Sequence, residues 1–562
     1  MKLTFERVMV MLPVKKPIFT AFFIAVSLVL LLTGCSSNGG ATKTGSNVSN
    51  DRANETKPAE GGELTYALAT APDTLDPHAS GMAVATRVIK SIFESLLYQD
   101  KNNELKPWLA TEWEVSDDKK TYTFKLRQGV KFHDGEPFNA EAVKFNFERI
   151  VDPATKSVAG SVYLKPVKSV EVVDDYTVKI ELEKPSATFL TLLAHSNISM
   201  VSPKAVKKYG DQFGQHPVGT GPFKFEKLSQ NDEIVLSKFE DYHGHYPFAE
   251  HKGAAYLDKL VFKIVPEEAT RIGSVQSGQI KAAETVPPQD IVSIKKGGQL
   301  KLWEAETGGL PYTIFVNNTT PPWNDVRARR ALKQSIDIDS IVNTLYLGTY
   351  KRAWSVLSPV TFGYDKELEG KDTYDVEQAN KTFDELGWKK DADGFRKKDG
   401  KTLTVRIIDD AVNREKRQDI SLMIKEQLKK VGIDVKIETT TEAQAILSDS
   451  KAYDLRGNSR VALDPDDLTL FYHSEQIYGQ RGFNIGWYKN AEVDRWLEQA
   501  AVEFDPAKRE ELYKKIQRKL IDDVASIPIY VFPYIVATTP DVQGLKFDSI
   551  GYPLFYDVNL KK

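Results

Sequence analysis

Residues 107–145 read PWLATEWEVSDDKKTYTFKLRQGVKFHDGEPFNAEAVKF, and this passage predicts a strand, a turn and a helix in direct succession. Tyr122, Phe124 and Leu126 alternate with polar residues, which is the pattern of a strand with one buried face. Asn139 is well placed to be the N-cap of the following helix, whose apolar residues recur on one face. The passage therefore indicates a fold that mixes strands and helices.

The turn between the strand and the helix contains a histidine beside an Asp-Gly pair. Asp134-Gly135 predicts a tight turn, because glycine tolerates the backbone angles that such a turn requires. We expect His133 to be a structural partner of turn backbone rather than a catalyst.

The same mixture of elements continues along the chain. Residues 168–182 predict a β-hairpin that turns at a pair of aspartates. Asp375 and Asp505 predict the N-caps of two further helices, and Gly387 predicts a helix stop. Strands and helices do not alternate strictly, which favours several α/β lobes over one parallel sheet.

The composition is that of a large globular protein. The chain has 562 residues, of which 41% are hydrophobic and 27% are charged. This length predicts about two to four lobes. The net charge of −3 leaves no basic surplus, so the composition speaks against nucleic-acid binding.

The N-terminus has the features of a secretory signal. Basic residues precede an apolar run from Ile18 to Leu32, which is short for a membrane-spanning helix of about 20 residues. The run ends in the letters LTGC, whose cysteine is Cys35, and this ending resembles a bacterial lipobox. The resemblance implies that residues 1–34 are a lipoprotein signal peptide, cleaved before Cys35, and that lipid is attached to the sulfur.

The sequence carries no positive feature of an enzyme. Cys35 is the only cysteine, so the chain has neither an internal disulfide nor a separate catalytic thiol. No Gly-x-Ser-x-Gly elbow and no His-Glu-x-x-His zinc motif occurs. Residues 35–60 are small and polar, and they predict a flexible tether between the lipid and the body.

Six sequence blocks together resemble the family 5 extracellular solute-binding proteins, which are the dipeptide, oligopeptide and nickel receptors of ABC importers. The blocks occur in the family's order and cover nearly all of residues 61–562. They are the opening passage 107–145, HPVGTGPFKF at 216–225, FEDYHG at 239–244, VNNTTPPWNDVRARRALKQSIDIDSIV at 316–342, NAEVDRWLEQA at 490–500 and ASIPIYV at 525–531.

The resemblance implies an α/β fold of the periplasmic-binding-protein type (type II, cluster C). It implies two lobes, an extra subdomain and a hinged ligand cleft. We expect lobe I to comprise residues 61–88, 216–305 and 526–562. The extra subdomain is expected at 89–215, and lobe II at 306–525.

One segment departs from the peptide-binding members of this family. There the region often reads Trp-x-x-Asp-x-x-Asp-Pro, and its first aspartate pairs with the ligand's ammonium terminus. Aligned on the Asp-Pro step at Asp464, the two expected residues are replaced by Asn458 and Val461. Arg460 beside them offers a planar fork suited to a carboxylate. Arg460 either binds an anionic group of the ligand or braces the loop by pairing with Asp454 or Asp464.

Further candidates lie in segments that pass near the ligand in the family. The predicted ligand-binding residues are Arg460, Asp464, Trp354, Arg352, His78, Met82, Gly309 and Leu310. His243 and His245 form a His-x-His pair that is a weaker alternative, because residues two apart lie on one side of a strand and can chelate a transition metal.

The resemblance implies a lipid-anchored receptor on the outer face of the cytoplasmic membrane. We expect it to act as a monomer, capture short peptides by lobe closure and deliver them to an ABC permease with cytoplasmic ATPases. The alternative is a receptor for nickel or another metal bound as a small chelate, and a non-transport lipoprotein is a further reading. We expect no enzymatic activity, no cofactor and no nucleic-acid partner.

Overall fold

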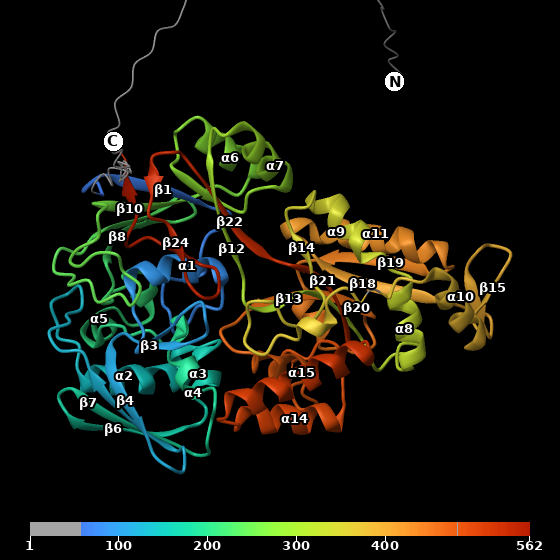
Figure 1. Cartoon of the computed structure of the whole chain (residues 1–562), viewed down its shortest axis with the longest axis horizontal. Coiled ribbons are helices and arrows are strands. Elements are labelled where there is room, and N and C mark those ends of the chain that lie inside the picture. Colours follow the sequence, from blue (N-terminus) through green and yellow to red (C-terminus); the bar gives the residue numbers. More distant parts are fainter. Residues whose placement is uncertain (1–57, 372, 480–481, 562) are drawn as a thin grey trace, which may run out of the picture. The chain divides into compact units, whose positions relative to one another are not determined.

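The computed structural model describes residues 58–371, 373–479 and 482–561. The predicted signal peptide, Cys35 and most of the predicted tether lie outside these described residues. Within them, the larger sheets have seven, six and four strands (Figure 1). None of the helices in this described part is both long and apolar enough to span a membrane.

Lobe I is the part built on the seven-stranded sheet, in the order β12-β22-β11-β1-β10-β9-β8. Along β1, Tyr66 packs with helix α1 on one face of the sheet, while Ala67 packs with α6 and α7 on the other. Because strand side chains alternate, each face has its own core and its own helices. The elements are β1 (Glu63–Leu68), β8 (Phe223–Ser229), β9 (Glu233–Lys238), β10 (Lys259–Ile264), β11 (Ala282–Glu284), β12 (Lys301–Glu306), β22 (Pro533–Thr538), α1 (Ala83–Ile92), α6 (Glu268–Gln276) and α7 (Pro288–Gly297).

Lobe II is built on the six-stranded sheet, in the order β14-β21-β13-β20-β18-β19. Strand β13 is buried along its whole length: Ile314 packs with α8 to α11, and Phe315 packs with α13 to α15. The elements are β13 (Gly309–Val316), β14 (Lys351–Arg352), β18 (Thr404–Asp410), β19 (Asp434–Thr440), β20 (Leu455–Val461), β21 (Ser526–Val531), α8 (Val326–Gln334), α9 (Ile338–Tyr346), α10 (Val376–Glu385), α11 (Arg417–Lys430), α12 (Ala443–Leu447), α13 (Asp467–Tyr472), α14 (Ala491–Ala501) and α15 (Pro506–Asp522).

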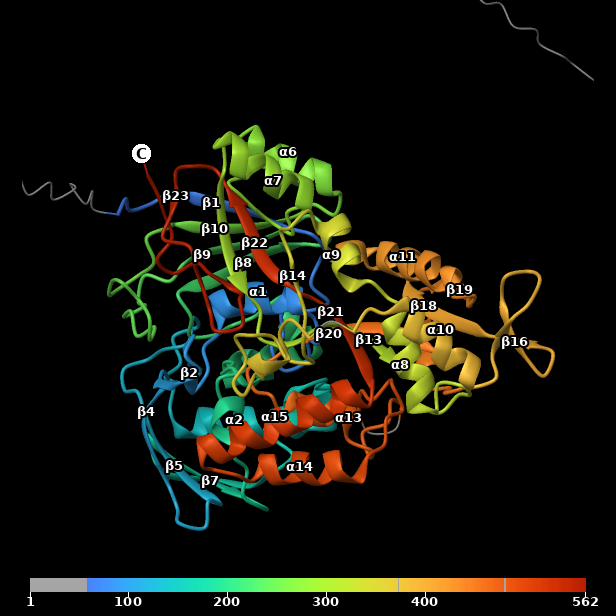
Figure 2. The same ribbon diagram turned by 45° about the vertical axis from the view of Figure 1, so that its right-hand side comes forward.

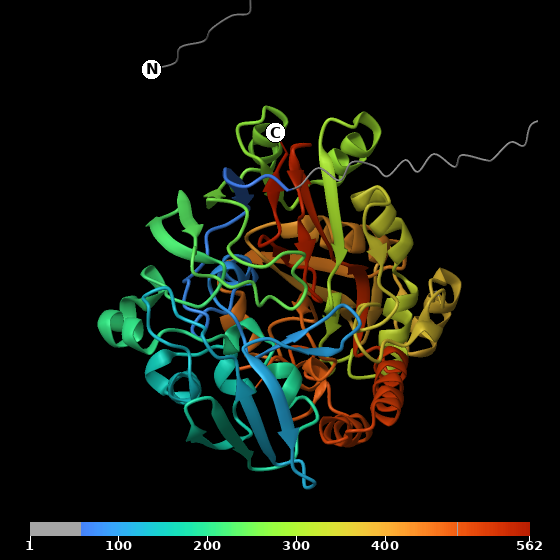
Figure 3. The ribbon, with the colours of Figure 1, turned by 60° about the vertical axis from the view of Figure 1, so that its left-hand side comes forward.

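The subdomain is built on an antiparallel sheet in the order β4-β5-β7-β6. Figure 3 shows its strands at the bottom of the view, away from α6 and α7. Its elements are β4 (Ala110–Val115), β5 (Thr121–Leu126), β6 (Val167–Asp174), β7 (Thr177–Leu182), α2 (Ala140–Val151), α3 (Gly160–Tyr163), α4 (Phe189–Leu192) and α5 (Pro203–Tyr209).

Short strands complete the described part. Figure 2 shows the loop of β16 projecting from the α10 end of lobe II. These strands are β2 (Leu97–Gln99), β3 (Leu105–Pro107), β15 (Lys389–Lys390), β16 (Arg396–Lys398), β17 (Lys401–Thr402), β23 (Val542–Gln543), β24 (Lys546–Phe547), β25 (Pro553–Leu554) and β26 (Asn559–Leu560).

The local predictions from the sequence are confirmed. Strand β5 covers the alternating residues, and Asn139 accepts a hydrogen bond from the backbone N–H of Ala142 at the start of α2. Asp375 and Asp505 cap α10 and α15 in the same way, and the 168–182 hairpin forms from β6 and β7. Polar side chains at these positions satisfy backbone N–H groups that a helix leaves unpaired.

Two backbone crossings join the lobes. Strand β12 of lobe I continues through Thr307 into β13 of lobe II, and β21 of lobe II returns through Phe532 to β22 of lobe I. The Thr307 hydroxyl donates a hydrogen bond of 2.7 Å to the Phe532 carbonyl, so the crossings run side by side. Such paired crossings are where a hinge between two lobes would lie.

Two of the expected lobe limits differ from the strand assignments. Strand β21 begins at Ser526 and pairs with β13 in lobe II, although residues from 526 onward were expected in lobe I. Its Ile527 and Ile529 belong to the lobe II core, and the chain reaches lobe I only at β22. Helix α1 runs past residue 88 to Ile92, whose side chain lies in the lobe I core.

The Gly-Thr-Gly turn at residues 219–221 brings distant backbone into contact. A Cβ on Gly219 would lie 2.1 Å from the Ile92 carbonyl oxygen, so only glycine allows this approach. His133 Nε2 hydrogen-bonds the Gly221 carbonyl at 2.9 Å, which confirms its expected role as a partner of turn backbone.

Glu94 is a fully buried carboxylate on which several sequence blocks converge. Its two oxygens accept hydrogen bonds from Trp108 Nε1 (3.0 Å), Thr220 Oγ1 (2.8 Å) and Tyr242 Oη (2.7 Å), and they meet His245 Nε2 at 2.8 Å. A charge removed from water is tolerated only when hydrogen bonds replace its hydration. Glu94 therefore joins lobe I to the start of the subdomain.

We expect Glu94→Ala to destabilise the protein by about 3–5 kcal/mol, because several buried donors would lose their acceptor. Urea titration monitored by tryptophan fluorescence measures the free energy of unfolding. The matched control is Glu112→Ala, which removes an exposed carboxylate and should change stability by less than about 0.5 kcal/mol. Equal effects of the two substitutions would contradict the role of Glu94.

Candidate functional site

A cavity of about 580 Å³ is lined by residues of both lobes and the subdomain. Lobe I contributes the loop after β1, the start of α1 and the end of β11. The subdomain contributes α3 and residues 195–197, while lobe II contributes the loop before α11 and the end of β20. The volume lies within the range of pockets for small organic ligands, and the wall mixes charged, polar and apolar side chains.

Arg460 lines this cavity from β20. Its Nε donates to Asp467 at 2.5 Å, and its Nη2 donates to the hydroxyl of Tyr163 at 2.8 Å. Tyr163 belongs to α3, so the second bond ties lobe II to the subdomain. Burial raises the pKa of Tyr163 to about 12, which keeps its hydroxyl neutral.

The loop before α11 places a second charged group at the cavity. Glu415 has φ 48° and ψ 36°, a left-handed conformation that costs a non-glycine residue energy. Its carboxylate lies 2.7 Å from Arg417 Nη2 and 3.0 Å from Arg414 Nε. Burial by itself would raise the pKa of Glu415, but the charges of Arg417 and Arg414 lower it below its ordinary value.

Lobe I provides the third charged group. Arg87, in α1, donates from Nη1 to Oε1 of Glu284 at 2.6 Å, and its guanidinium lies over the ring of Tyr534. Glu284 is fully buried at the end of β11. Among the described residues, the guanidinium groups of Arg87, Arg414 and Arg460 line the cavity with the carboxylates of Glu284 and Glu415, while Asp467 holds Arg460 from behind the wall. The arginines at the wall suit an anionic ligand.

The structure places Asp464 away from the cavity wall. Its two oxygens accept hydrogen bonds from Arg509 of α15 at 2.6 and 3.0 Å, and the side chain is buried. Asp464 therefore has a structural role, in which it connects its loop to α15. Asp454 is likewise occupied by Arg406 at 2.9 Å, so Arg460 pairs with Asp467 rather than with either aspartate expected from the sequence.

The two predicted ligand-binding residues in the loop after β1, Met82 and His78, have different surroundings. Met82 is exposed and lines the cavity. His78 is fully buried beneath it, with Nε2 bonded to the Ser199 carbonyl at 2.8 Å and Nδ1 2.7 Å from Arg149. Burial lowers the pKa of His78 to about 4. His78 therefore supports the loop from below and does not line the cavity.

Gly309 and Leu310 lie behind the cavity wall rather than on it. Gly309 has φ 95°, and a Cβ there would lie 2.4 Å from the carbonyl oxygen of Arg460. Its N–H donates to Thr361 Oγ1 at 2.8 Å. These contacts fix the bulge at the start of β13, and with it the backbone of Arg460.

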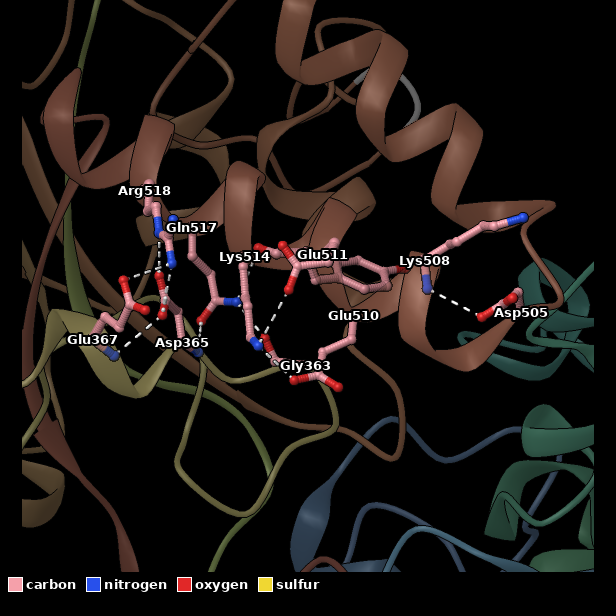
Figure 4. A network of polar contacts seen from close by, with 11 residues as sticks. Gly363, Asp365, Glu367, Asp505, Lys508, Glu510, Glu511, Lys514, Gln517 and Arg518 are labelled. Carbon is pink, nitrogen blue, oxygen red and sulfur yellow. Dashed lines mark hydrogen bonds and ion pairs between the residues drawn. The ribbon is translucent and has the colours of Figure 1, made fainter.

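The loop that contains Thr361 is itself held by helix α15 (Figure 4). Gln517 Nε2 donates to the Gly363 carbonyl at 2.6 Å, and Arg518 Nε donates to Asp365 at 2.6 Å. The network reaches the hinge through the Gly309 contact, so α15 stabilises the hinge without touching the cavity.

Arg352 and Trp354 form a pair outside the cavity. The Arg352 guanidinium lies 3.9 Å from the centre of the Trp354 ring and forms an ion pair with Asp339. This stacking, together with the ion pair, accounts for both side chains as a structural unit on lobe II.

The two histidines of the His-x-His pair are used differently. His243 is exposed, whereas His245 binds the buried Glu94. Among the described residues, no group of three or more His, Cys, Asp or Glu side chains is arranged to hold a metal ion. The geometry therefore does not bring His243 and His245 together as a metal site.

Sequence reasoning missed Arg87, Tyr163, Glu284, Arg414 and Glu415 as cavity residues. The letters REKR at 414–417 form a run of charges before a helix, and this run was a usable signal. Arg87 and Glu284 gave no such signal in the sequence, because they come from different elements and meet only in the folded chain.

Comparison with known proteins gives a consistent result. Residues 104–479 match the model of the bacterial extracellular solute-binding proteins, family 5 middle. The glutathione-binding protein GsiB of Escherichia coli is 30% identical over 499 residues, covering 86% of this chain and 91% of that protein.

Solved structures share the fold. The oligopeptide-binding protein AppA of Bacillus subtilis, in complex with a nonapeptide, is 26% identical with a TM-score of 0.77, covering 90% of this chain and 100% of that one. NikA of Brucella suis, in complex with Fe(III)-EDTA, is 24% identical with a TM-score of 0.79, covering 89% and 100%. This is the type II periplasmic-binding-protein fold, with mixed α/β content.

Asp466, beside the Asp464–Arg509 pair, makes stability depend on pH. Burial, and next the charge of Asp464, raise the pKa of Asp466 from 3.8 to about 6. The folded state therefore binds this proton more tightly than the unfolded state does. The resulting stability is present below about pH 4 and is lost as the pH rises through 6.

Asp466→Asn mimics the protonated side chain. The variant should therefore become more stable than the natural protein as the pH rises from about 4 to 6, and the difference in stability should stay constant at higher pH. We expect a rise in Tm on the order of a few °C at pH 7.5 and little change at pH 4. Differential scanning calorimetry at several pH values measures this difference. Asp117→Asn, at an exposed turn position, is the control, and the same pH trend in both variants would contradict the assignment.

Proposed function

This chain belongs to the bacterial extracellular solute-binding proteins of family 5, which serve ABC importers and are not enzymes, and from that premise we propose that its ligands are short peptides. The peptide would bind in the cavity between the lobes and be delivered to a membrane permease after closure. The observation that carries this proposal is the cavity itself, because its wall is assembled from both lobes and the subdomain.

The hinge geometry supports capture by closure. The paired crossings at Thr307 and Phe532 are the strand connections between the two large sheets, so they are the natural axis of movement. A ligand that contacts both lobes stabilises the closed form by the difference in its affinity for the closed and open forms. No covalent step is required for this function.

Arg460 is proposed to bind an anionic group of the peptide, such as its terminal carboxylate. It lies on the cavity wall, and its contact with Tyr163 crosses from lobe II to the subdomain. A guanidinium held by Asp467 on one side loses little freedom when a ligand binds on the other. The name of the GsiB relative makes glutathione, a peptide with carboxylate groups, a reasonable first probe.

The anchor to the membrane is proposed to be lipid on Cys35. The LTGC ending and the following polar residues support this proposal. The body would then work on the outer face of the cytoplasmic membrane.

The test of the proposed function is native mass spectrometry of residues 61–562, purified from cells without denaturation. A heterogeneous set of retained peptide masses is the expected result. A single small adduct with a metal isotope pattern would instead assign the cavity to a metal chelate. If the protein is empty, titration with glutathione and a mixed tripeptide library must give binding, or peptide capture is wrong.

We expect Arg460→Ala to weaken binding of a retained peptide by about 2–5 kcal/mol, because a charged partner of the ligand would be lost in a closed cleft. Isothermal titration calorimetry measures the affinity. Arg495→Ala, which removes an arginine whose side chain is 60% exposed, should leave the affinity unchanged. Tyr163→Phe separates the loss of the guanidinium from the loss of its contact with the subdomain. If Arg460→Ala leaves the affinity unchanged, Arg460 does not bind the peptide and only stabilises its loop.

A further inference from the structure

We propose that the ligand of this cleft carries two anionic groups, and that Arg87 of lobe I binds one while Arg460 of lobe II binds the other. The substrate class would then be short acidic peptides, which have a side-chain carboxylate in addition to the terminal one. This inference rests on the proposed function and narrows the proposed ligands from short peptides to short acidic peptides.

Arg87 has most of its hydrogen-bonding capacity unused. Its side chain is only 12% exposed, and its guanidinium lies 4.9 Å from the ring centre of Tyr534 and 5.7 Å from that of Tyr552. It donates one hydrogen bond, to Glu284, and within the described part of the chain its buried Nε has no partner. A guanidinium carries five N–H donors in a fixed plane. Two tyrosine rings therefore hold an arginine at the cavity wall with donors available for a ligand.

Glu284 has little capacity left for a ligand cation. Its Oε1 accepts hydrogen bonds from Arg87 and from the backbone N–H of Ala69 at 3.2 Å, and its Oε2 accepts one from the Tyr534 hydroxyl. The side chain is fully buried. Glu284 thus positions Arg87 and offers no free face to a ligand ammonium.

A second arginine stands behind Glu284. Arg271 is 1% exposed and donates to the backbone carbonyls of Val265, Pro266, Glu284 and Thr285. Thr285 itself lines the cavity. Arg271 does not line the cavity, and the carboxylates of Glu284, Glu268 and Glu267 all act on its charge, so Arg271 supports the lobe I wall from behind.

On the lobe II side, one carboxylate serves two arginines. Glu415 is shared by Arg414 and Arg417, while Asp467 is matched one to one by Arg460. Within the described part of the chain, the arginines at the cavity and their ion-pair partners are Arg87, Arg414, Arg417 and Arg460 against Glu284, Glu415 and Asp467, so the positive groups exceed the carboxylates. In a cleft that excludes water, such charges are weakly screened and attract anionic groups strongly.

This distribution favours a ligand with an anionic group toward each lobe. A ligand with one carboxylate meets the unused donors of Arg87 or those of Arg460. A ligand with two carboxylates satisfies both and also links the lobes, so it gains most from closure. The second carboxylate is thus expected to determine specificity.

The experiment compares matched tripeptides by isothermal titration calorimetry at low salt. One pair is Glu-Ala-Ala with Gln-Ala-Ala, and the other is Ala-Ala-Glu with Ala-Ala-Gln, so that two spacings between the carboxylates are covered. In at least one pair, we expect the glutamate peptide to bind about tenfold or more tightly than its amide analogue. This preference should decrease as ionic strength rises.

Arg87→Gln should reduce the preference for the glutamate peptide to about one. Arg495→Gln, which removes a surface arginine, should keep the preference of the natural protein. If Arg87→Gln does not fold, as judged by circular dichroism, Arg87→Lys provides the second variant. It keeps the charge but loses the planar fork, and an intermediate preference is expected.

Equal affinities within both peptide pairs would overturn the proposal and leave peptide capture intact. A preference that Arg87→Gln or Arg87→Lys does not change would also overturn it, by assigning the second carboxylate to another residue. If the natural protein binds none of the four peptides and retains no peptide from cells, the proposed function is wrong, and this inference fails with it.

Discussion

The buried carboxylate of Glu94 is the constraint on which the arrangement of lobe I and the subdomain depends. It follows directly after α1, and its hydrogen-bond partners come from three separate parts of the chain: Trp108, Thr220 and the segment of Tyr242 and His245. A buried charge must be satisfied wherever it lies, so these segments are required to meet at one point. The Gly-Thr-Gly turn allows this meeting, because its glycines pass against the end of α1 where a side chain would collide. The same helix positions Arg87 at the cavity, and the structural core and the candidate site therefore share one element.

The second organising feature is the pair of chain crossings between the large sheets. The crossings at Thr307 and Phe532 are held to one another, while Gly309 is held by Thr361 from a loop that α15 fixes in turn. Rigid elements on both sides of a short connection favour motion at the connection itself. The cavity lies between the parts that would move, and it is lined from all three of them. This arrangement agrees with membership of a family of solute-binding proteins that serve ABC importers.

The charges at the cavity are arranged in held pairs rather than as isolated groups. Each guanidinium on the wall has a carboxylate that orients it: Glu284 for Arg87, Glu415 for Arg414 and Asp467 for Arg460. Oriented arginines bind planar anions at low entropic cost, because their geometry is set before the ligand arrives. The left-handed backbone conformation of Glu415 also indicates a fixed geometry. A non-glycine residue keeps this conformation only where its surroundings hold it in place. Arg87, Arg414 and Arg460 are thus oriented at the cavity by neighbouring carboxylates.

The sequence by itself determined the local elements, the family and the class of function. Caps at Asn139, Asp375 and Asp505, the alternation in β5 and the hairpin at 168–182 depend on neighbouring residues, so they were predictable from short passages. Of the ligand-binding residues predicted from the sequence, Arg460 and Met82 line the cavity. Only the tertiary structure decided which charged side chains pair. Asp464 pairs with Arg509, and His245 pairs with Glu94. Arg87 pairs with Glu284, which is 197 positions away in the chain. The physical reason is that an ion pair is set by distance in space, and a buried charge takes whichever partner the packing brings within reach.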